Sequence, residues 1–130
     1  MGHLSTHVLD TAQGRPAAGM RVTLQREGAA GFETVKALTL NDDGRADGPL
    51  LDAAAMAVGR YRLLFEVAPY FRTRGVALPE PPFIDTVQLD FGIADAAADR
   101  PLRPVTVTVE TRRRPAPGVR VFTSASDGRF

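Results

Sequence analysis

The chain has 130 residues, of which 44% are hydrophobic and 24% charged, so it is long enough for one ordinary domain with one core and too short for two. Its net charge of +1 argues against a general polyanion binder, and its lack of cysteine excludes disulfides, thiolate metal sites and cysteine nucleophiles. No apolar run approaches the roughly 20 residues of a membrane helix, and the amino-terminal residues lack the basic start and apolar block of a secretory signal. We therefore expect a single cytoplasmic domain over residues 1–130, without nucleic-acid or membrane partners.

Basic charge is concentrated near the carboxyl end. Residues 1–99 carry nine basic and thirteen acidic side chains, whereas residues 100–130 carry seven basic and two acidic ones. The run of Arg112, Arg113 and Arg114 has the chemistry to grip phosphates bidentately. No aromatic residue is interleaved with this run to stack bases, so a solvated arginine turn is the simpler interpretation.

The hydrophobic pattern has a period of two over short runs that end at glycine, proline, asparagine and aspartate, which is typical of an all-β sandwich. The first predicted strand covers residues 4–10 and places His7 on the face opposite Leu4, Thr6 and Val8. A turn-rich break separates this strand from a second and a third one, which are predicted over 20–25 and 32–40.

A strong turn signal follows the third predicted strand. Residues 41–44, Asn-Asp-Asp-Gly, tolerate the positive φ angles of tight turns, and Arg45 stands directly after them. The next predicted strand, 60–67, is the clearest in the chain, because four alternate residues form one apolar face: Tyr61, Leu63, Phe65 and Val67. We expect this strand in the middle of the core.

One short helix is predicted over 69–76. Pro69 fits the first turn of a helix and Gly75 fits its end, although so short a helix needs packing to be stable. Three prolines, at positions 79, 81 and 82, then exclude regular structure.

Three more strands complete the predicted fold. A strand over 83–91 alternates again, with four residues expected to point inward: Phe83, Val87, Leu89 and Phe91. An alanine-rich linker over 94–99 leads to strands at 105–110 and 119–123. Seven or eight strands with one short helix indicate a Greek-key-like β-sandwich.

Several separated motifs resemble one known family. Residues 4–11, Leu-Ser-Thr-His-Val-Leu-Asp-Thr, followed by Gly14, Pro16 and Ala17, resemble the amino-terminal signature of the 5-hydroxyisourate hydrolases, the transthyretin-related enzymes. Residues 41–45 are similar to the second motif of that family, residues 59–65 to its central strand, and Tyr70-Phe71 with 79–83 to its helix and proline segment. The resemblance covers residues 3–95, and residues 96–130 diverge.

This resemblance implies a transthyretin-like sandwich that opens the ring of 5-hydroxyisourate in urate degradation, without a metal or an organic cofactor. It also implies a dimer or tetramer, with sites between subunits, assembled through the outward faces that bear His7. The alternative is a non-catalytic sandwich that binds a small molecule or a protein partner.

The resemblance assigns His7 and Arg45 to the catalytic site. An imidazole titrates near neutrality, so His7 is suited to deprotonate water, and the always-charged, forked guanidinium of Arg45 is suited to orient carbonyl oxygens and to hold an oxyanion. Without the resemblance, a polar residue on an outward strand face and a solvated arginine after a turn would be the simpler interpretations.

The closing stretch departs from the family pattern. Members carry a His-x-His-x-Pro strand and end in Tyr-Arg-Gly-Ser, and this chain has neither. Alignment of that strand on Pro104 places Arg100 and Leu102 at the two histidine positions. We therefore expect weakened hydrolysis, with Arg100 as a candidate substrate contact.

Three interpretations of the carboxyl end stay open. In the first, residues 105–110 and 119–123 supply the last two strands of the sandwich. In the second, the carboxyl end begins a second module, because residues 114–121 echo residues 15–22. In the third, a reading-frame error lies near residue 98.

Other catalytic and metal sites are weaker candidates. Ser5, Ser124 and Ser126 lack the nucleophile elbow of a serine hydrolase. The carboxylates of the 42–52 stretch lack the spacing of a calcium loop, and His3 with His7 offers two imidazoles without further ligands. No metal site is therefore predicted.

Overall fold

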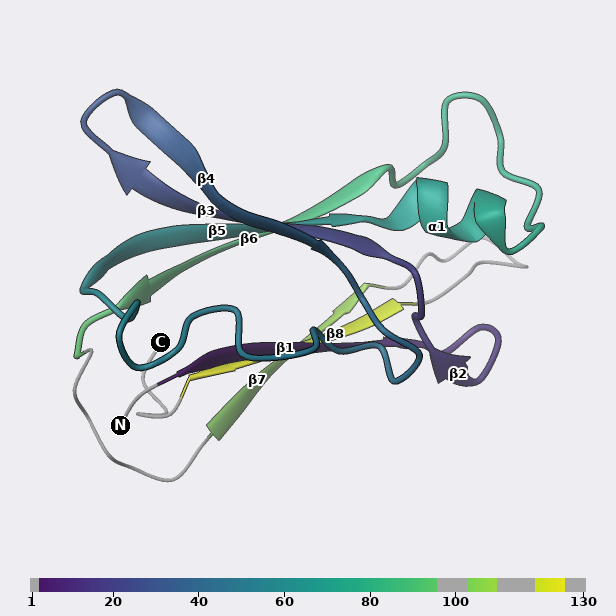
Figure 1. Cartoon of the computed structure of the whole chain (residues 1–130). Helices are drawn as coiled ribbons and strands as arrows, with labels where there is room; N and C mark the ends of the chain where they lie inside the picture. Colours follow the sequence, from purple (N-terminus) through teal and green to yellow (C-terminus); the bar gives the residue numbers. More distant parts are fainter. Residues whose placement is uncertain (1–2, 96–102, 110–118, 126–130) are drawn as a thin grey trace.

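The computed structural model describes residues 3–95, 103–109 and 119–125, which form two four-stranded antiparallel sheets (Figure 1). Their elements in chain order are β1 (Leu4–Asp10), β2 (Arg15–Pro16), β3 (Arg21–Gly28), β4 (Gly31–Thr39), β5 (Gly59–Glu66), α1 (Val67–Thr73), β6 (Thr86–Ile93), β7 (Arg103–Val109) and β8 (Val119–Ala125). Eight strands and one short helix agree with the predicted sandwich. The described residues contain no helix with the length and apolar character that a membrane crossing requires.

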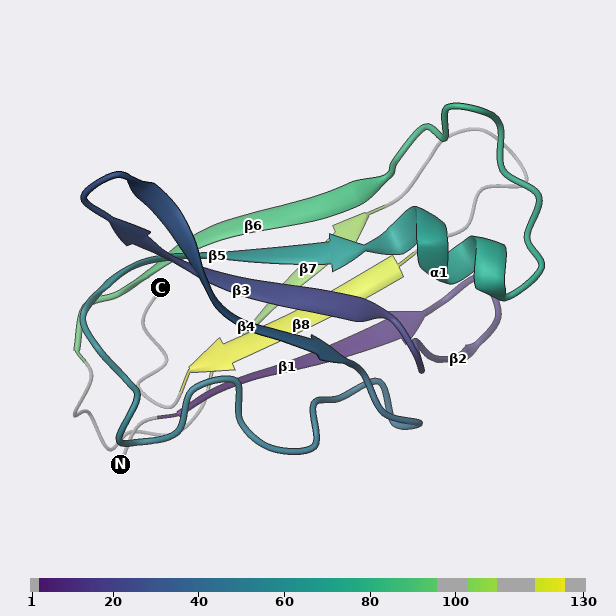
Figure 2. The ribbon, with the colours of Figure 1, turned by 45° about the horizontal axis from the view of Figure 1, so that its top comes forward.

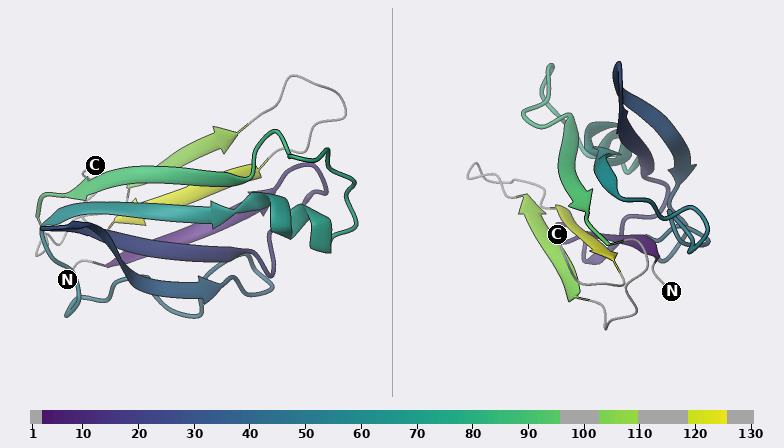
Figure 3. Two further views of the ribbon diagram at one scale, coloured as in Figure 1. Left: turned by 90° about the horizontal axis from the view of Figure 1, so that it is seen from above. Right: turned by 90° about the vertical axis from the view of Figure 1, so that its left-hand side faces the viewer.

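The two sheets lie face to face. One has the strand order β2-β1-β8-β7 and the other β4-β3-β5-β6, and Figure 2 shows the second sheet in front of the first. In the end-on view of Figure 3 the sheets form two layers. This is the sandwich that the alternating pattern predicts, because each strand of such a pattern has one face to bury.

The last two strands, β7 and β8, complete the first sheet. β8 pairs with β1 along its whole length, from Leu4 opposite Ala125 to Asp10 opposite Val119, and β7 pairs with β8. The backbone therefore agrees with the interpretation that residues near 105–110 and 119–123 complete the sandwich. The loop expected between them lies outside the described residues, and the single-domain interpretation stays a prediction.

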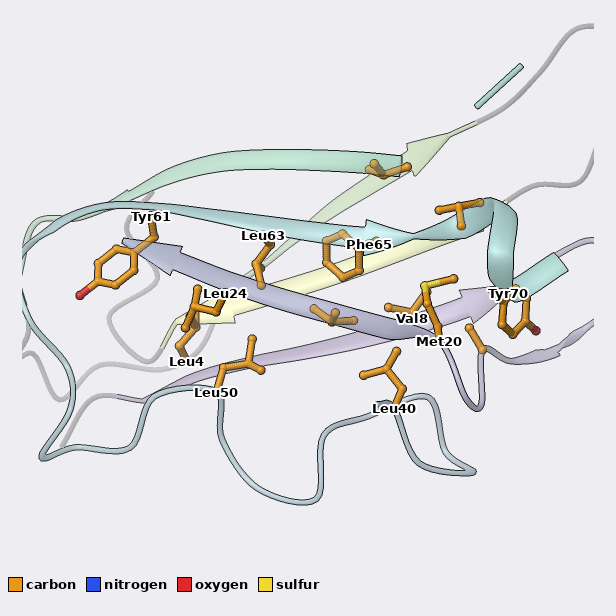
Figure 4. Packing of buried hydrophobic residues seen from close by; sticks show 14 of the residues in the cluster. Leu4, Val8, Met20, Leu24, Leu40, Leu50, Tyr61, Leu63, Phe65 and Tyr70 are labelled. Atoms are coloured by element: carbon orange, nitrogen blue, oxygen red, sulfur yellow. The ribbon is translucent and has the colours of Figure 1, made fainter. Parts of the chain in front are cut away.

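Alternate residues of the inner strands fill the space between the sheets. Leu4 and Val8 of β1 and Leu63 and Phe65 of β5 are 0% exposed. Figure 4 shows these side chains together with Leu40 and Leu50 from the segment between β4 and β5, all pointing into the same core. The position of 60–67 in the middle of the core is thus confirmed for its inward residues, which are Tyr61, Leu63, Phe65 and Val67.

The helix differs from its predicted bounds. It begins at Val67, which the alternating pattern assigns to a strand, and ends at Thr73, with Gly75 in the left-handed region at φ 79°. Val67 and Ala68 donate backbone hydrogen bonds to the Asp85 carbonyl, at 3.1 and 3.0 Å. These bonds to the start of β6 stabilise the first turn, so the chain leaves the strand two residues before Pro69.

The strand predicted over 83–91 is shifted. β6 begins at Thr86, and Phe83, expected to point inward, is 82% exposed. The prolines at 81 and 82 have no N–H for a strand ladder, so residues before Thr86 stay outside the sheet. Val87 and Ile93 are buried, and Leu89 and Phe91 pack against the core at partial exposure.

Candidate active site

His7 lies on the outward face of the first sheet. It follows Thr6 and precedes Val8 on β1, and both neighbours point into the core at 4% and 0% exposure. Because successive side chains of a strand point to opposite faces, the His7 ring is directed away from the core. On this outward face His7 is half-buried. The outward position predicted for His7 is confirmed.

The turn that precedes Arg45 lies against β1. The segment between β4 and β5 runs along the edge of β1 opposite β8 (Figure 2), and Arg45 pairs with His7 in an antiparallel bridge. The Val8 N–H donates to the Gly44 carbonyl at 2.9 Å. The structure thus brings the two predicted catalytic residues side by side, whereas Arg100 lies outside the described residues.

Gly44 makes this close approach possible. Its φ of 73° lies in the left-handed region, and a Cβ at this position would overlap the Val8 carbonyl oxygen and lie 3.1 Å from the Ala17 backbone nitrogen. The same Val8 oxygen accepts a hydrogen bond from Ala17 at 3.0 Å. Only a residue without a side chain allows the turn, β1 and the β1–β2 connection to meet here.

The surroundings of His7 lower its pKa below the ordinary value of 6.5. Desolvation is the largest cause and the Arg45 guanidinium the second, since both disfavour the imidazolium form. A hydrogen bond to the Asp43 backbone carbonyl and the Asp43 carboxylate act in the opposite direction. At neutral pH the ring is therefore neutral and able to accept a proton.

Charge-neutralising variants should move the pKa of His7 in opposite directions. We expect Arg45→Gln to raise this pKa, because the cation that opposes protonation is removed, and Asp43→Asn to lower it. Titration of the His7 ring by NMR measures both changes. A decrease in Arg45→Gln would contradict the placement of its guanidinium near the ring.

Two acidic residues of the 42–52 stretch accept local hydrogen bonds. Asp47 accepts a hydrogen bond from the Asn41 amide at 3.2 Å, and the Asp52 carboxylate accepts one from the Ala55 N–H at 2.9 Å. Among the described residues, no group of three or more histidine, aspartate or glutamate side chains is arranged to hold a metal ion. The two contacts connect residues close in sequence, within 41–55.

A buried polar pair was not singled out by the sequence analysis. The Tyr70 hydroxyl donates to Asp10 Oδ2 at 2.8 Å, and the Gln13 N–H donates to Asp10 Oδ1 at 3.0 Å. Burial, followed by the Asp10 contact, raises the pKa of Tyr70 to about 12. The pair fastens α1 to the end of β1, and the only sequence signal for it was a carboxylate at an otherwise inward strand position.

Comparison with known proteins finds similar sequences and structures over most of the chain. The sequence model of the HIUase/Transthyretin family matches residues 4–106. The 5-hydroxyisourate hydrolase 2 of Rhizobium meliloti is 50% identical over 95 residues, which are 73% of this chain and 79% of the relative. The 5-hydroxyisourate hydrolase of Ralstonia nicotianae is 46% identical over 98 residues, 75% and 84% of the two chains. The structure of Klebsiella pneumoniae 5-hydroxyisourate hydrolase superimposes with a TM-score of 0.56 and 34% identity, over 69% of this chain and 77% of that one.

Proposed function

Because the chain belongs to the HIUase/transthyretin family, we propose that it is a hydrolase that opens the ring of 5-hydroxyisourate. The observation that carries the proposal is the bridge between His7 and Arg45, which places a neutral imidazole beside a guanidinium on an outward sheet face. The proposed reaction uses water and these side chains, without a metal or an organic cofactor, and takes place in the cytoplasm.

In the proposed mechanism His7 takes a proton from water while the water oxygen adds to a ring carbonyl carbon. The Arg45 guanidinium stabilises the negative charge that develops on the carbonyl oxygen. When the tetrahedral intermediate collapses, the ring C–N bond breaks and the imidazolium of His7 returns its proton to the leaving nitrogen. One water molecule is consumed, and the product carries a new carboxyl group.

We further propose that this hydrolysis is weak. The positions aligned with the two histidines of the family's closing strand hold Arg100 and Leu102, and the chain contains only two histidines, His3 and His7. Loss of one member of a proton-transfer set lowers the rate by about 10²- to 10⁴-fold. Arg100 is the proposed substrate contact at the position of the first missing imidazole.

The test is an assay in which urate oxidase generates 5-hydroxyisourate and its ultraviolet decay is followed with and without the protein. We expect decay faster than the spontaneous rate but slower than with the Rhizobium meliloti relative at equal concentration. Decay at the spontaneous rate would contradict the proposal and support the binding-module alternative. A rate equal to that of the relative would contradict the weakening and indicate that Arg100 or Arg103 replaces the histidine electrostatically.

We also propose that the chain forms a dimer or tetramer through the outward face of β1. Ser5, His7 and Leu9 lie on this face and are half-buried even in the isolated chain. Light scattering should give a multiple of 14.0 kDa. Leu9→Arg should lower the particle mass, whereas Val35→Arg should not, because Val35 lies on β4 of the other sheet, where it is 48% exposed. A 14.0 kDa particle for the unmodified chain at micromolar concentration would contradict this assembly.

A further inference from the structure

β4 lies at the edge of its sheet. In the strand order β4-β3-β5-β6, β3 is its neighbour within the described part of the chain. β4 has nine residues, Gly31–Thr39, and its hairpin with β3 projects from the rest of the sheet (Figure 1). The free side of an edge strand presents a row of backbone N–H and C=O groups, on which a strand of another molecule can pair. An edge of this length therefore needs a feature that prevents such pairing.

A β-bulge interrupts the regular backbone of β4. Lys36 is opposite Leu24 of β3, and Thr34 is opposite the next residue, Gln25, so Val35 stands without an opposite residue on β3. A bulged residue bends its strand and increases the local twist. The backbone groups on the free side of β4 therefore do not form the straight, regular row that a second strand would need.

Two charged residues of β4 occupy positions on the core-facing side of the sheet. Residues opposite each other in an antiparallel pair have their side chains on the same face. Lys36 is opposite Leu24, which is 0% exposed, so Lys36 has the orientation of a core residue. Glu33 is opposite Arg26, which is itself opposite Tyr61 of β5 at 1% exposure. Inward-facing charges on an edge strand are one of the features by which natural sheets prevent edge-to-edge pairing.

The contact of Lys36 agrees with its inward position. Its Nζ donates a hydrogen bond to the Pro49 carbonyl, in the segment between β4 and β5, at 3.4 Å. Pro49 is followed by Leu50, which points into the core and is 2% exposed (Figure 4). A strand added to β4 would extend the sheet over the Lys36 ammonium group and remove it from water, which is costly for a charged group.

We propose that the Val35 bulge and the inward Lys36 together prevent β4 from pairing with the β4 of a second copy of this chain. β1 belongs to the other sheet, so the self-association proposed for its outward face does not use the β4 edge. A second contact, between β4 edges, would join such particles into open chains instead of closed assemblies. The bulge and the inward charge therefore keep the assembly finite.

The test is a chain from which both features are removed, by deletion of Val35 and by Lys36→Val. The deletion restores a one-to-one ladder with β3, and valine supplies a β-branched apolar side chain at the inward position. Light scattering compares the variant with the unmodified chain at equal micromolar concentrations. The particle mass of the variant should rise with concentration and at least double, because each pairing of two β4 edges joins two particles.

Three controls assign this association to the β4 edge. Lys36→Arg keeps the inward charge and should keep the original mass. Thr34→Val places the same apolar residue on the opposite face of β4, beside Gln25, and should also keep the original mass. The added mass should persist when Leu9→Arg is introduced, because Leu9 lies on β1 in the other sheet.

Hydrogen exchange locates the new contact. In the associated variant the amides of residues 31–39 should exchange more slowly than in the unmodified chain, since the free side of β4 becomes paired. Circular dichroism checks that each variant is folded, and Lys36→Val alone supplies the readout where the deletion does not fold.

Three results would overturn the inference. The first is a folded variant whose mass equals that of the unmodified chain, and the second is an equal rise in mass for Thr34→Val. The third is an added mass that Leu9→Arg abolishes or that leaves the exchange of residues 31–39 unchanged, because the association would then use another surface. None of these results depends on whether the chain hydrolyses 5-hydroxyisourate.

Discussion

His7→Ala is expected to return the decay of 5-hydroxyisourate to its spontaneous rate. Removal of a general base typically costs about 10²- to 10⁴-fold, and the unmodified chain is already expected to be slow. His3 is the only other histidine in the sequence. It immediately precedes β1, four residues before His7. The assay with urate oxidase measures the effect, because it separates catalysed from spontaneous decay in one trace.

Two controls separate loss of the base from loss of the fold. His3→Ala removes an imidazole outside the proposed site and should leave the rate within about twofold. Added imidazole should restore part of the rate of His7→Ala, because a small base can enter the space that the side chain vacates. Acceleration that is unchanged in His7→Ala would refute the assignment of His7 as the base.

Leu63→Ala should cost about 2 to 5 kcal/mol of unfolding free energy. Leu63 is 0% exposed and lies in the middle of β5, opposite Leu24 of β3 and Leu89 of β6. Its truncation removes buried methyl groups and leaves a cavity that two paired neighbours cannot fill without distortion of the sheet. Urea denaturation at fixed protein concentration measures the change, since self-association would otherwise shift the apparent stability.

Leu64→Ala is the matched control for this prediction. Leu64 is the next residue of β5, is only half-buried, and points to the opposite face of the sheet, so its truncation should cost at most about 1 kcal/mol. A loss below about 0.5 kcal/mol for Leu63→Ala would contradict its place in the core.

Much of the fold was predictable because alternation is a local property. Leu4 and Val8, or Leu63 and Phe65, share a face wherever their strand lies, since the strand period is two. The turn at 41–44 was equally predictable, because Gly44 adopts a positive φ angle, which glycine does without strain. The outward position of His7 follows from the same alternation.

The helix bounds and the exposure of Phe83 could not be predicted from the sequence. An alternating pattern does not show where a strand stops, and Val67 continues the pattern while the backbone already turns helical. Phe83 fits the pattern of β6 by sequence, but β6 begins only at Thr86, where the ladder with Glu66 begins. Local hydrophobicity carries no information on these pairings.

The sequence by itself thus determined which residues face the core and that a tight turn precedes Arg45, because both depend on near neighbours and backbone sterics. Only the tertiary structure decided that this turn lies against β1 beside His7, and that Tyr70 reaches the buried carboxylate of Asp10. Such contacts join residues far apart in the chain, and they depend on which sheet edge each segment meets. At Gly44 the lack of a side chain allows the turn to lie directly against the Val8 carbonyl of β1.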